Sequence, residues 1–279
     1  MKKVIEIFII LVALGVLIYF SFNSYTTAKE LEGIKQEYYE AQMDIGELLQ
    51  RRFDSLLSAI SFGAIGKKSS KVEDLERLKA KALIVQEENR RVTLTLGGVS
   101  IAILLTYFLV SLDSYALLLG FASLVALIFG IFTPILMIVI HKNVHYLGDI
   151  ILSFESKTIA GTIMHLYSNG NYPVAIAILL FSIVVPFLKT LSMIAVTFWR
   201  EFHIAQRLVR LFKDLGKWSM LDVFVVALLL VYLSAGSTEN SYSEIESGLY
   251  LFLIYVIFSI VTSIVVERLL KQGVAKGEF

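Results

Sequence analysis

The sequence contains no cysteine, only three prolines and few charged residues. Without cysteine, the chain has no disulfide, no thiolate zinc site, no iron–sulfur cluster and no cysteine nucleophile. Charged residues make up 18% of the 279 residues and apolar residues 57%, whereas a typical soluble domain has about 25% charged residues. Together with a mean hydropathy of +0.74, this composition predicts a membrane protein.

Neither sign of charge is in excess, because 25 basic residues face 24 acidic ones. A nucleic-acid-binding protein normally carries a basic surplus, so we expect no nucleic acid among the partners. The sequence also contains no glycine-rich phosphate loop, no Gly-x-Ser-x-Gly elbow and no His-Glu-x-x-His motif. We therefore expect no enzymatic activity, no catalytic residues, no metal site and no cofactor.

Six apolar runs are long enough to cross a hydrocarbon core, which takes about 18 or more helical residues. The first run, 5–22, follows a short basic start and lacks a cleavage site, so we interpret it as an uncleaved anchor. The block 92–140 is too long for one helix and is interrupted at 111–114, which predicts two spans. The remaining runs are 173–198, 220–235 and 248–266. The fold class expected is therefore all-α, a polytopic membrane protein with six transmembrane helices.

The charges of the loops predict the orientation, because Lys and Arg are retained on the cytoplasmic side of short loops. The loop 200–217 is rich in Arg and Lys, whereas the loop 236–247 carries three glutamates and no basic residue. We therefore expect both termini to be cytoplasmic. This topology places residues 24–91 and 141–172 outside the cytoplasm.

The polar segment 24–91 shows helical spacing of its apolar residues in two stretches separated by a break at 63–70. This pattern predicts an antiparallel helical hairpin outside the membrane. The apolar sets are Leu31, Ile34, Tyr38, Ala41, Ile45 and Leu48 in the first stretch, and Val72, Leu75, Leu78, Ala82 and Val85 in the second.

Two segments of the chain resemble the paraquat-inducible protein A family. The first, Tyr172–Lys189, contains Ser182 and Pro186. The second, 215–227, reads Leu-Gly-Lys-Trp-Ser-Met-Leu-Asp-Val-Phe-Val-Val-Ala and contains Trp218, Ser219 and Asp222. The similarity extends over residues 116–270, which form a single four-span module.

The resemblance implies a bacterial inner-membrane protein that works beside a periplasmic protein with mammalian-cell-entry domains and transports lipids between the two membranes of the envelope. Many members of the family carry cysteine-containing zinc ribbons and two copies of the module, whereas this chain has no cysteine and room for one module. A second membrane subunit or a second copy of the chain is therefore expected to complete the assembly. A non-transporting scaffold or regulator of a neighbouring envelope complex is the alternative function.

These inferences divide the chain into five parts. They are an N-terminal transmembrane anchor (1–23), a periplasmic helical hairpin (24–91), a second transmembrane helix with its turn (92–115), the four-span module (116–270) and a cytoplasmic tail (271–279).

Lys189 is the first candidate functional residue, because an intramembrane charge is costly and marks a functional site by default. Asp222, near the start of the following span, lies within reach of a lysine side chain if the two helices are neighbours. We therefore expect Lys189 and Asp222 to form a functional polar pair. In the alternative interpretation Lys189 extends to the headgroups and Asp222 caps its own helix.

Pro186 cannot donate a backbone hydrogen bond, so it is expected to kink its span and to free a carbonyl around Ser182. The alternative is a static kink satisfied by the Ser182 hydroxyl.

Two further groups of residues have simpler interpretations. His141, His145 and Asp149 are four residues apart, which would align them on one helix face, but surface histidines near the lipid interface are the preferred interpretation. The glycines of the spans are interpreted as residues that permit close helix packing. They are Gly97, Gly98, Gly120 and Gly130.

Overall fold

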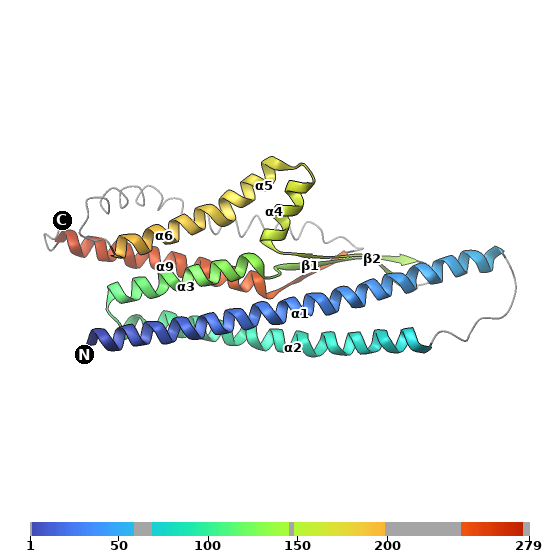
Figure 1. The fold of residues 1–279 in the computed structure, drawn as a ribbon, viewed down its shortest axis with the longest axis horizontal. Helices are drawn as coiled ribbons and strands as arrows, with labels where there is room; N and C mark the ends of the chain where they lie inside the picture. Colours follow the sequence, from blue (N-terminus) through green and yellow to red (C-terminus); the bar gives the residue numbers. More distant parts are fainter. Residues whose placement is uncertain (1, 59–68, 145–147, 199–240, 276–279) are drawn as a thin grey trace.

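The computed structural model describes residues 2–58, 69–144, 148–198 and 241–275, and these residues are mostly helical. Long helices lie roughly parallel, and a small sheet lies beyond the ends of two of them (Figure 1). Five helices are long and apolar enough to cross a membrane: Lys2–Met43, Asp74–Phe108, Leu112–Phe132, Tyr172–Phe198 and Ser247–Gln272. The predicted span 220–235 lies outside the described residues, so the sixth crossing stays a prediction.

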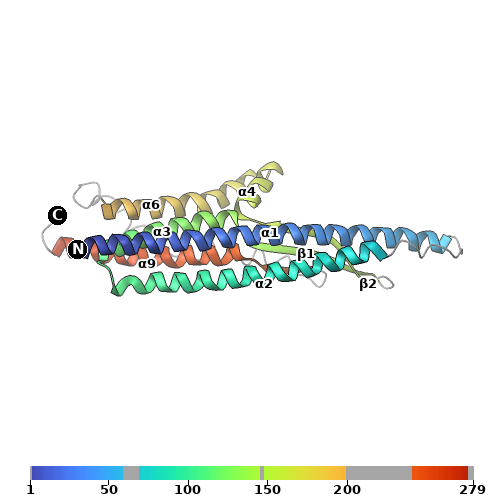
Figure 2. The same cartoon turned by 60° about the horizontal axis from the view of Figure 1, so that its bottom comes forward.

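Helix α1 (Lys2–Ser58) and helix α2 (Ser69–Leu105) form a long antiparallel pair. They lie side by side in both views (Figures 1 and 2). The 57 residues of α1 correspond to about 85 Å of helix at 1.5 Å per residue. The predicted anchor and the first half of the predicted hairpin are thus one continuous helix. The residues that would connect the pair, 59–68, lie outside the described part of the chain.

The buried face of α1 repeats at alternating steps of four and three residues as far as Lys35, as in a coiled coil, and continues with a step of four to Tyr39. Its members are Leu17, Ser21, Ser24, Ala28, Leu31, Lys35 and Tyr39. The apolar spacing of the sequence predicts Ile34 and Tyr38 on this face, but Lys35 and Tyr39 are the buried residues there. The spacing of apolar residues did not predict this face correctly, because Lys35 occupies a buried position where it pairs with the buried Glu246. On α2 the predicted residues Leu75, Leu78, Ala82 and Val85 are the less exposed ones, as expected.

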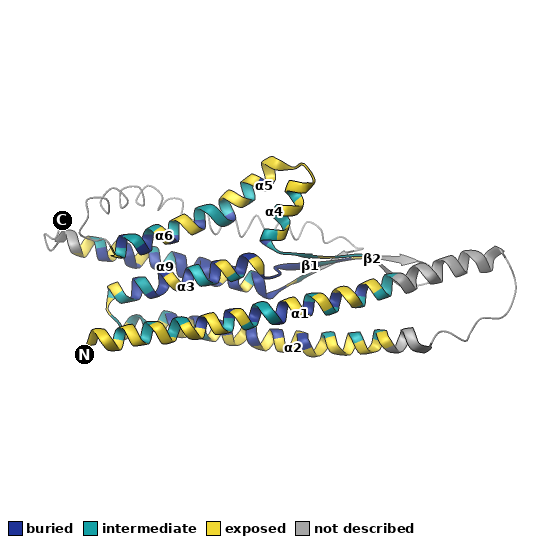
Figure 3. Cartoon of the chain, viewed as in Figure 1, coloured by how far each residue is buried: buried dark blue, intermediate teal, exposed yellow. Residues whose placement is uncertain are grey.

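Helix α3 (Leu112–Phe132) and helix α9 (Ser247–Ala275) form the centre of the bundle. Buried residues gather on these two helices and on the neighbouring strand (Figure 3). A Cβ on Gly130 would lie 3.1 Å from the backbone nitrogen of Phe252, and one on Gly120 would lie 2.6 Å from Cγ1 of Ile194. These two glycines therefore permit close helix packing, as predicted.

The packing role predicted for Gly97 and Gly98 is wrong. A Cβ added at either position would meet nothing within 4 Å. Both glycines lie on α2, whose buried face in this region is formed by Leu96 and Ser100 instead.

A three-stranded antiparallel sheet forms where the sequence analysis expected helix or loop. Strands β1 (Leu136–Val144), β2 (Gly148–Lys157) and β3 (Ser241–Ile245) have the order β2-β1-β3. Leu136 pairs with Lys157 on β2 and with Ile245 on β3. The third span ends at Phe132 because Thr133, which precedes Pro134, has an extended backbone. The apolar residues that follow, several of them β-branched, suit a strand better than a helix.

This sheet also corrects the expected helical alignment of two histidines and an aspartate. His141 lies on β1 and Asp149 lies on β2, where Asp149 pairs with Asn143. His145 lies outside the described residues. The helical spacing predicted for this group is therefore wrong.

After β2 the chain forms helix α4 (Ile159–Ser168) and then a long segment composed of α5 (Tyr172–Leu179), the π-helix η2 (Leu180–Val184) and α6 (Val185–Phe198). The start of α1, the end of α6 and the end of α9 lie at one end of the bundle (Figure 1). The sheet lies toward the opposite end. The predicted location of both termini on one side agrees with this arrangement, and their cytoplasmic assignment stays a prediction.

Candidate functional site

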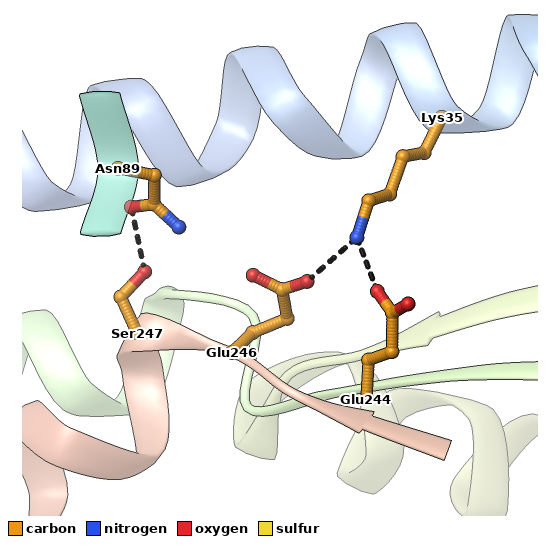
Figure 4. Close-up of polar contacts among 5 residues, drawn as sticks. All are labelled: Lys35, Asn89, Glu244, Glu246 and Ser247. Atoms are coloured by element: carbon orange, nitrogen blue, oxygen red, sulfur yellow. Dashed lines mark hydrogen bonds and ion pairs between the residues drawn. The ribbon is translucent and has the colours of Figure 1, made fainter. Parts of the chain in front are cut away.

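A cluster of buried polar side chains joins the two N-terminal helices to the rest of the molecule (Figure 4). We define the polar junction as Lys35 from α1, Asn89 from α2, Glu244 from β3, and Glu246 with Ser247 at the start of α9. Lys35, Asn89, Glu246 and Ser247 are each more than nine-tenths buried. Burying such groups is costly unless they are paired, so their partners determine where the elements meet.

Lys35 is the positive centre of the polar junction. Its Nζ donates to Oε2 of Glu244 at 2.5 Å and to Oε1 of Glu246 at 3.1 Å. The two carboxylates come from the β3–α9 segment, whereas the lysine comes from α1. These ion pairs therefore connect parts of the chain that are more than two hundred residues apart in sequence.

The polar junction holds more acidic than basic groups, and this changes the chemistry of Glu246. Burial raises the pKa of the Glu246 carboxyl, and the nearby charges of Glu244 and Glu32 raise it further. Lys35 opposes these effects without cancelling them. Glu32 itself is paired with Lys29 at 3.1 Å. The Glu246 carboxyl consequently takes up a proton more readily than an ordinary glutamate does.

Asn89 links three helices through its side-chain oxygen. The Ser247 hydroxyl donates to Oδ1 of Asn89 at 3.0 Å, and the Thr27 hydroxyl of α1 donates to the same oxygen at 3.3 Å. A single amide on α2 thus fixes the relative position of α1 and the first turn of α9.

The backbone of the β3–α9 segment is held on its other side by the linker between α3 and β1. The Glu246 N–H donates to the Ile135 carbonyl at 2.9 Å, and the Gly248 N–H donates to the Pro134 carbonyl at 2.8 Å. A Cβ on Gly248 would lie 2.4 Å from the Thr133 carbonyl oxygen. Only glycine permits this approach, so the start of α9 is clamped between the linker and the polar junction.

Lys189, the lysine singled out from the sequence, lies on α6 and is half-buried. The next residue, Thr190, is buried, and its hydroxyl donates to the Pro186 carbonyl at 3.0 Å. Asp222, Trp218 and Ser219 lie outside the described residues. The pairing of Lys189 with Asp222 therefore stays a prediction.

Pro186 and Ser182 are both buried and lie at an irregular turn of their helix. Residues Leu180–Val184 form a π-helix, in which the Val185 N–H donates to the Leu180 carbonyl five residues earlier. Pro186 has no N–H to donate to the Ser182 carbonyl, which removes one ordinary helical hydrogen bond at this point. The structure shows a widened turn directly before Pro186, a feature frequent at functional sites. The kink and the freed carbonyl expected around Ser182 stay a prediction.

The polar junction was not predicted from the sequence. The signal was the spacing of Lys35, which is seven residues from Ala28 and so continues the buried face of α1. Glu244 and Glu246 were used only to orient a loop. In the part of the chain that the structure describes, no group of three or more His, Asp or Glu side chains is arranged to hold a metal ion.

Comparisons with known proteins agree with the family suggested by the sequence. The model of a family described as paraquat-inducible protein A matches residues 114–271, from the start of α3 into α9. The intermembrane transport protein PqiA of Escherichia coli strain K12 is 33% identical over 124 residues, which cover 41% of this chain and 29% of that protein. The protein of the same name from Shigella flexneri matches with the same figures. The match thus spans less than a third of the length of these relatives.

No solved structure matches the chain. The apolar helices and the relatives together indicate a multi-pass membrane protein.

Proposed function

Because the chain belongs to the paraquat-inducible protein A family, we propose that it is the inner-membrane component of an intermembrane lipid transport system. It moves phospholipid and works with a periplasmic protein that has mammalian-cell-entry domains. The family match over residues 114–271 carries this proposal. The relatives, whose names describe intermembrane transport, support it over the part of the chain that they cover.

In this proposal both termini are cytoplasmic, and the sheet and the distal part of α1 and α2 are periplasmic. The α1–α2 pair extends past the sheet (Figure 1) and so offers a surface for the periplasmic partner at a distance from the membrane. The polar junction supports this role, because it connects the pair rigidly to the start of α9. A partner bound to the pair is thereby coupled to the four-span module.

Within the module, we propose that Lys189 and Asp222 form a polar pair whose contact changes as lipid passes. The π-helix before Pro186 supports this assignment, because a widened turn is more readily rearranged than a regular one. We further propose that a second copy of the chain or a second membrane subunit completes the transport unit.

The partner proposal is tested by shortening the α1–α2 pair without disturbing the polar junction. Thr27 of α1 contacts Asn89 of α2. Because the two helices are antiparallel, residue 43 of α1 lies opposite residue 73 of α2, each about 16 residues from this contact. Replacing residues 44–72 by a short turn removes the distal part and leaves Lys35 and Asn89 in place. We expect the shortened protein to insert and fold but to recover less of the periplasmic protein on purification from mild detergent.

The matched control is a chain of full length with Lys79→Ala, an exposed position on α2. Mass spectrometry identifies proteins and lipids in the preparations of the unchanged chain, the shortened chain and the Lys79→Ala control. Undiminished recovery of the partner with the shortened chain would reject the docking role. Absence of bound phospholipid from the full-length protein, together with a stable complex, would favour the scaffold over the transporter.

The site proposal is tested with Lys189→Met and Asp222→Asn at matched protein levels. Each variant is expected to abolish complementation of an envelope-lipid defect, and the double variant is expected to be no worse, because residues that act as one unit are not additive. Full activity of Lys189→Met would remove the site assignment.

A further inference from the structure

Helix α4 and the beginning of α5 belong to an uncharged stretch that is longer than a membrane span requires. From Thr158 to Leu188 the chain has no Asp, Glu, Lys or Arg, and His165 is the only histidine of this stretch. The span in this region begins at Tyr172. The ten residues of α4 therefore precede the span and still carry no formal charge, which is unusual for a helix that faces water.

The orientation of α4 differs from that of the other helices. The long helices run along a common direction, whereas α4 crosses this direction steeply next to the sheet (Figure 1). If the apolar helices cross the membrane, a helix steeply inclined to them lies near the membrane plane. The Thr158 side chain caps α4 by accepting a hydrogen bond from the Gly161 N–H at 2.9 Å, and Ile159 is buried in the core. One end of α4 is thereby anchored to the protein.

The exposed face of α4 includes two large apolar or aromatic side chains beside the polar His165 and Ser168. Met164 is 74% exposed and Tyr167 is 63% exposed. Tyr167 packs edge-to-face against Tyr172 at the start of α5, with ring centroids 5.1 Å apart. Aromatic rings with a polar tip are enriched where the hydrocarbon core meets the headgroups. The exposed surface continues onto the span through Val174.

We propose that α4 and the turn before α5 lie in the headgroup layer of the leaflet next to the sheet, with Met164 and Tyr167 in contact with lipid. The occupant of this face is the lipid leaflet itself, because the face is continuous with a span and has no charge to offer a polar partner. This inference does not depend on lipid transport, since an interfacial helix contacts the leaflet whether or not lipid is moved.

The same chemistry predicts that the contact is independent of lipid charge. The nearest cation before α4 is Lys157, which is paired with Glu155 at 3.1 Å. Anionic lipids strengthen the binding of interfacial helices that carry Lys or Arg on their polar face, and α4 carries neither. Zwitterionic lipid is therefore sufficient.

The absence of cysteine makes the test direct, because one introduced cysteine carries one fluorophore. Met164→Cys and Tyr167→Cys are labelled with an environment-sensitive nitrobenzoxadiazole dye, and the full chain is placed in phosphatidylcholine vesicles. Val12→Cys on the exposed apolar face of α1 is the lipid-facing control. Lys79→Cys on α2 is the water-facing control.

We expect the dye at positions 164 and 167 to emit at shorter wavelength than at position 79. Quenching by nitroxide-labelled lipid should reach within about twofold of that at position 12, as for a helix whose apolar face enters the acyl boundary. Iodide in the buffer should quench these positions less than position 79. Replacing part of the phosphatidylcholine by phosphatidylglycerol should change none of these values.

Two outcomes would overturn the proposal. Iodide quenching at both positions equal to that at position 79 would show that α4 faces water. Protection from iodide and from nitroxide lipid alike would show that protein covers α4. Because the readout is lipid contact in a purified protein, neither outcome depends on whether the chain transports lipid.

Discussion

Helices α3 and α9 are held together differently from helix α1 and its neighbours. In their most apolar stretches, 61% of α3 and 56% of α9 are buried, against 11% of α1. The α3–α9 contact uses close backbone approach at Gly130, whereas α1 is attached by ion pairs and hydrogen bonds of the polar junction. The α3–α9 contact thus relies on close backbone packing, whereas the attachment of α1 adds ion pairs and hydrogen bonds to apolar contacts such as that of Phe22 with Phe129.

The difference has a physical reason. Lipid tails are as apolar as leucine, so apolar side chains alone do not drive two helices together in a membrane. Small residues provide close packing in the α3–α9 contact. A long helix pair needs something that determines its register, and a few buried polar residues do this in coiled coils. Lys35 and Asn89 occupy such positions.

The largest expected effect comes from Gly248→Ala, which tests the shape-based contact at the start of α9. The added Cβ would lie 2.4 Å from one backbone oxygen and 2.5 Å from another. The backbone cannot give way as a side chain can, so we expect a loss of more than about 3 kcal/mol and little folded protein. Gel filtration and thermal unfolding in detergent measure this. Gly97→Ala, in open space, is the control, and equal behaviour of the two variants would contradict the clamp.

The next effect is expected from Lys35→Met, which breaks the chemical contact. It leaves Glu244 and Glu246 together without their cation, and breaking a buried ion pair costs about 3–5 kcal/mol. Adding Glu244→Gln and Glu246→Gln should recover much of the thermal stability. Lys29→Met, which removes an exposed lysine from its pair with Glu32, should cost about 0–1 kcal/mol. Failure of the triple variant to recover would show that Lys35 acts through packing and not through charge.

A smaller effect is expected from Asn89→Ala, which removes the acceptor shared by Ser247 and Thr27. The loss of a buried acceptor should cost about 1–3 kcal/mol, seen as a lower unfolding temperature. Arg90→Ala, at an exposed neighbouring position, is the control. An unchanged unfolding temperature for Asn89→Ala would mean that the hydrogen bonds of this residue do not hold the three helices.

The smallest effect concerns pH. The pKa of Glu246 is raised by burial above its ordinary value of 4.5. The folded state therefore binds this proton more tightly than the unfolded chain does, and stability is lost as pH rises from 4.5 through the raised pKa. The groups facing Glu246 are Lys35, Glu244 and Glu32. Glu246→Gln should weaken the dependence of the unfolding temperature on pH in this range. An unchanged dependence would contradict the raised pKa of Glu246.

Much of the architecture followed from the sequence because hydropathy and loop spacing report directly on membrane insertion. The five described spans lie where long apolar runs predict them. The family similarity was equally accessible, since it rests on residues that hydropathy alone would not select. These features are determined by residues close together in the sequence or by the preference of apolar helices for the membrane.

The sheet and the polar junction were decided by the tertiary structure. The apolar residues 135–140 are compatible both with the end of a transmembrane helix and with a β-strand. The pairing of β1 with β2 and β3 stabilises the strand. Lys35 is polar by composition, yet it is buried because Glu244 and Glu246 meet it from the other end of the chain. Contacts between residues so far apart in sequence arise only when the elements pack, because the cost of burying each charge is offset by a partner that local sequence does not contain.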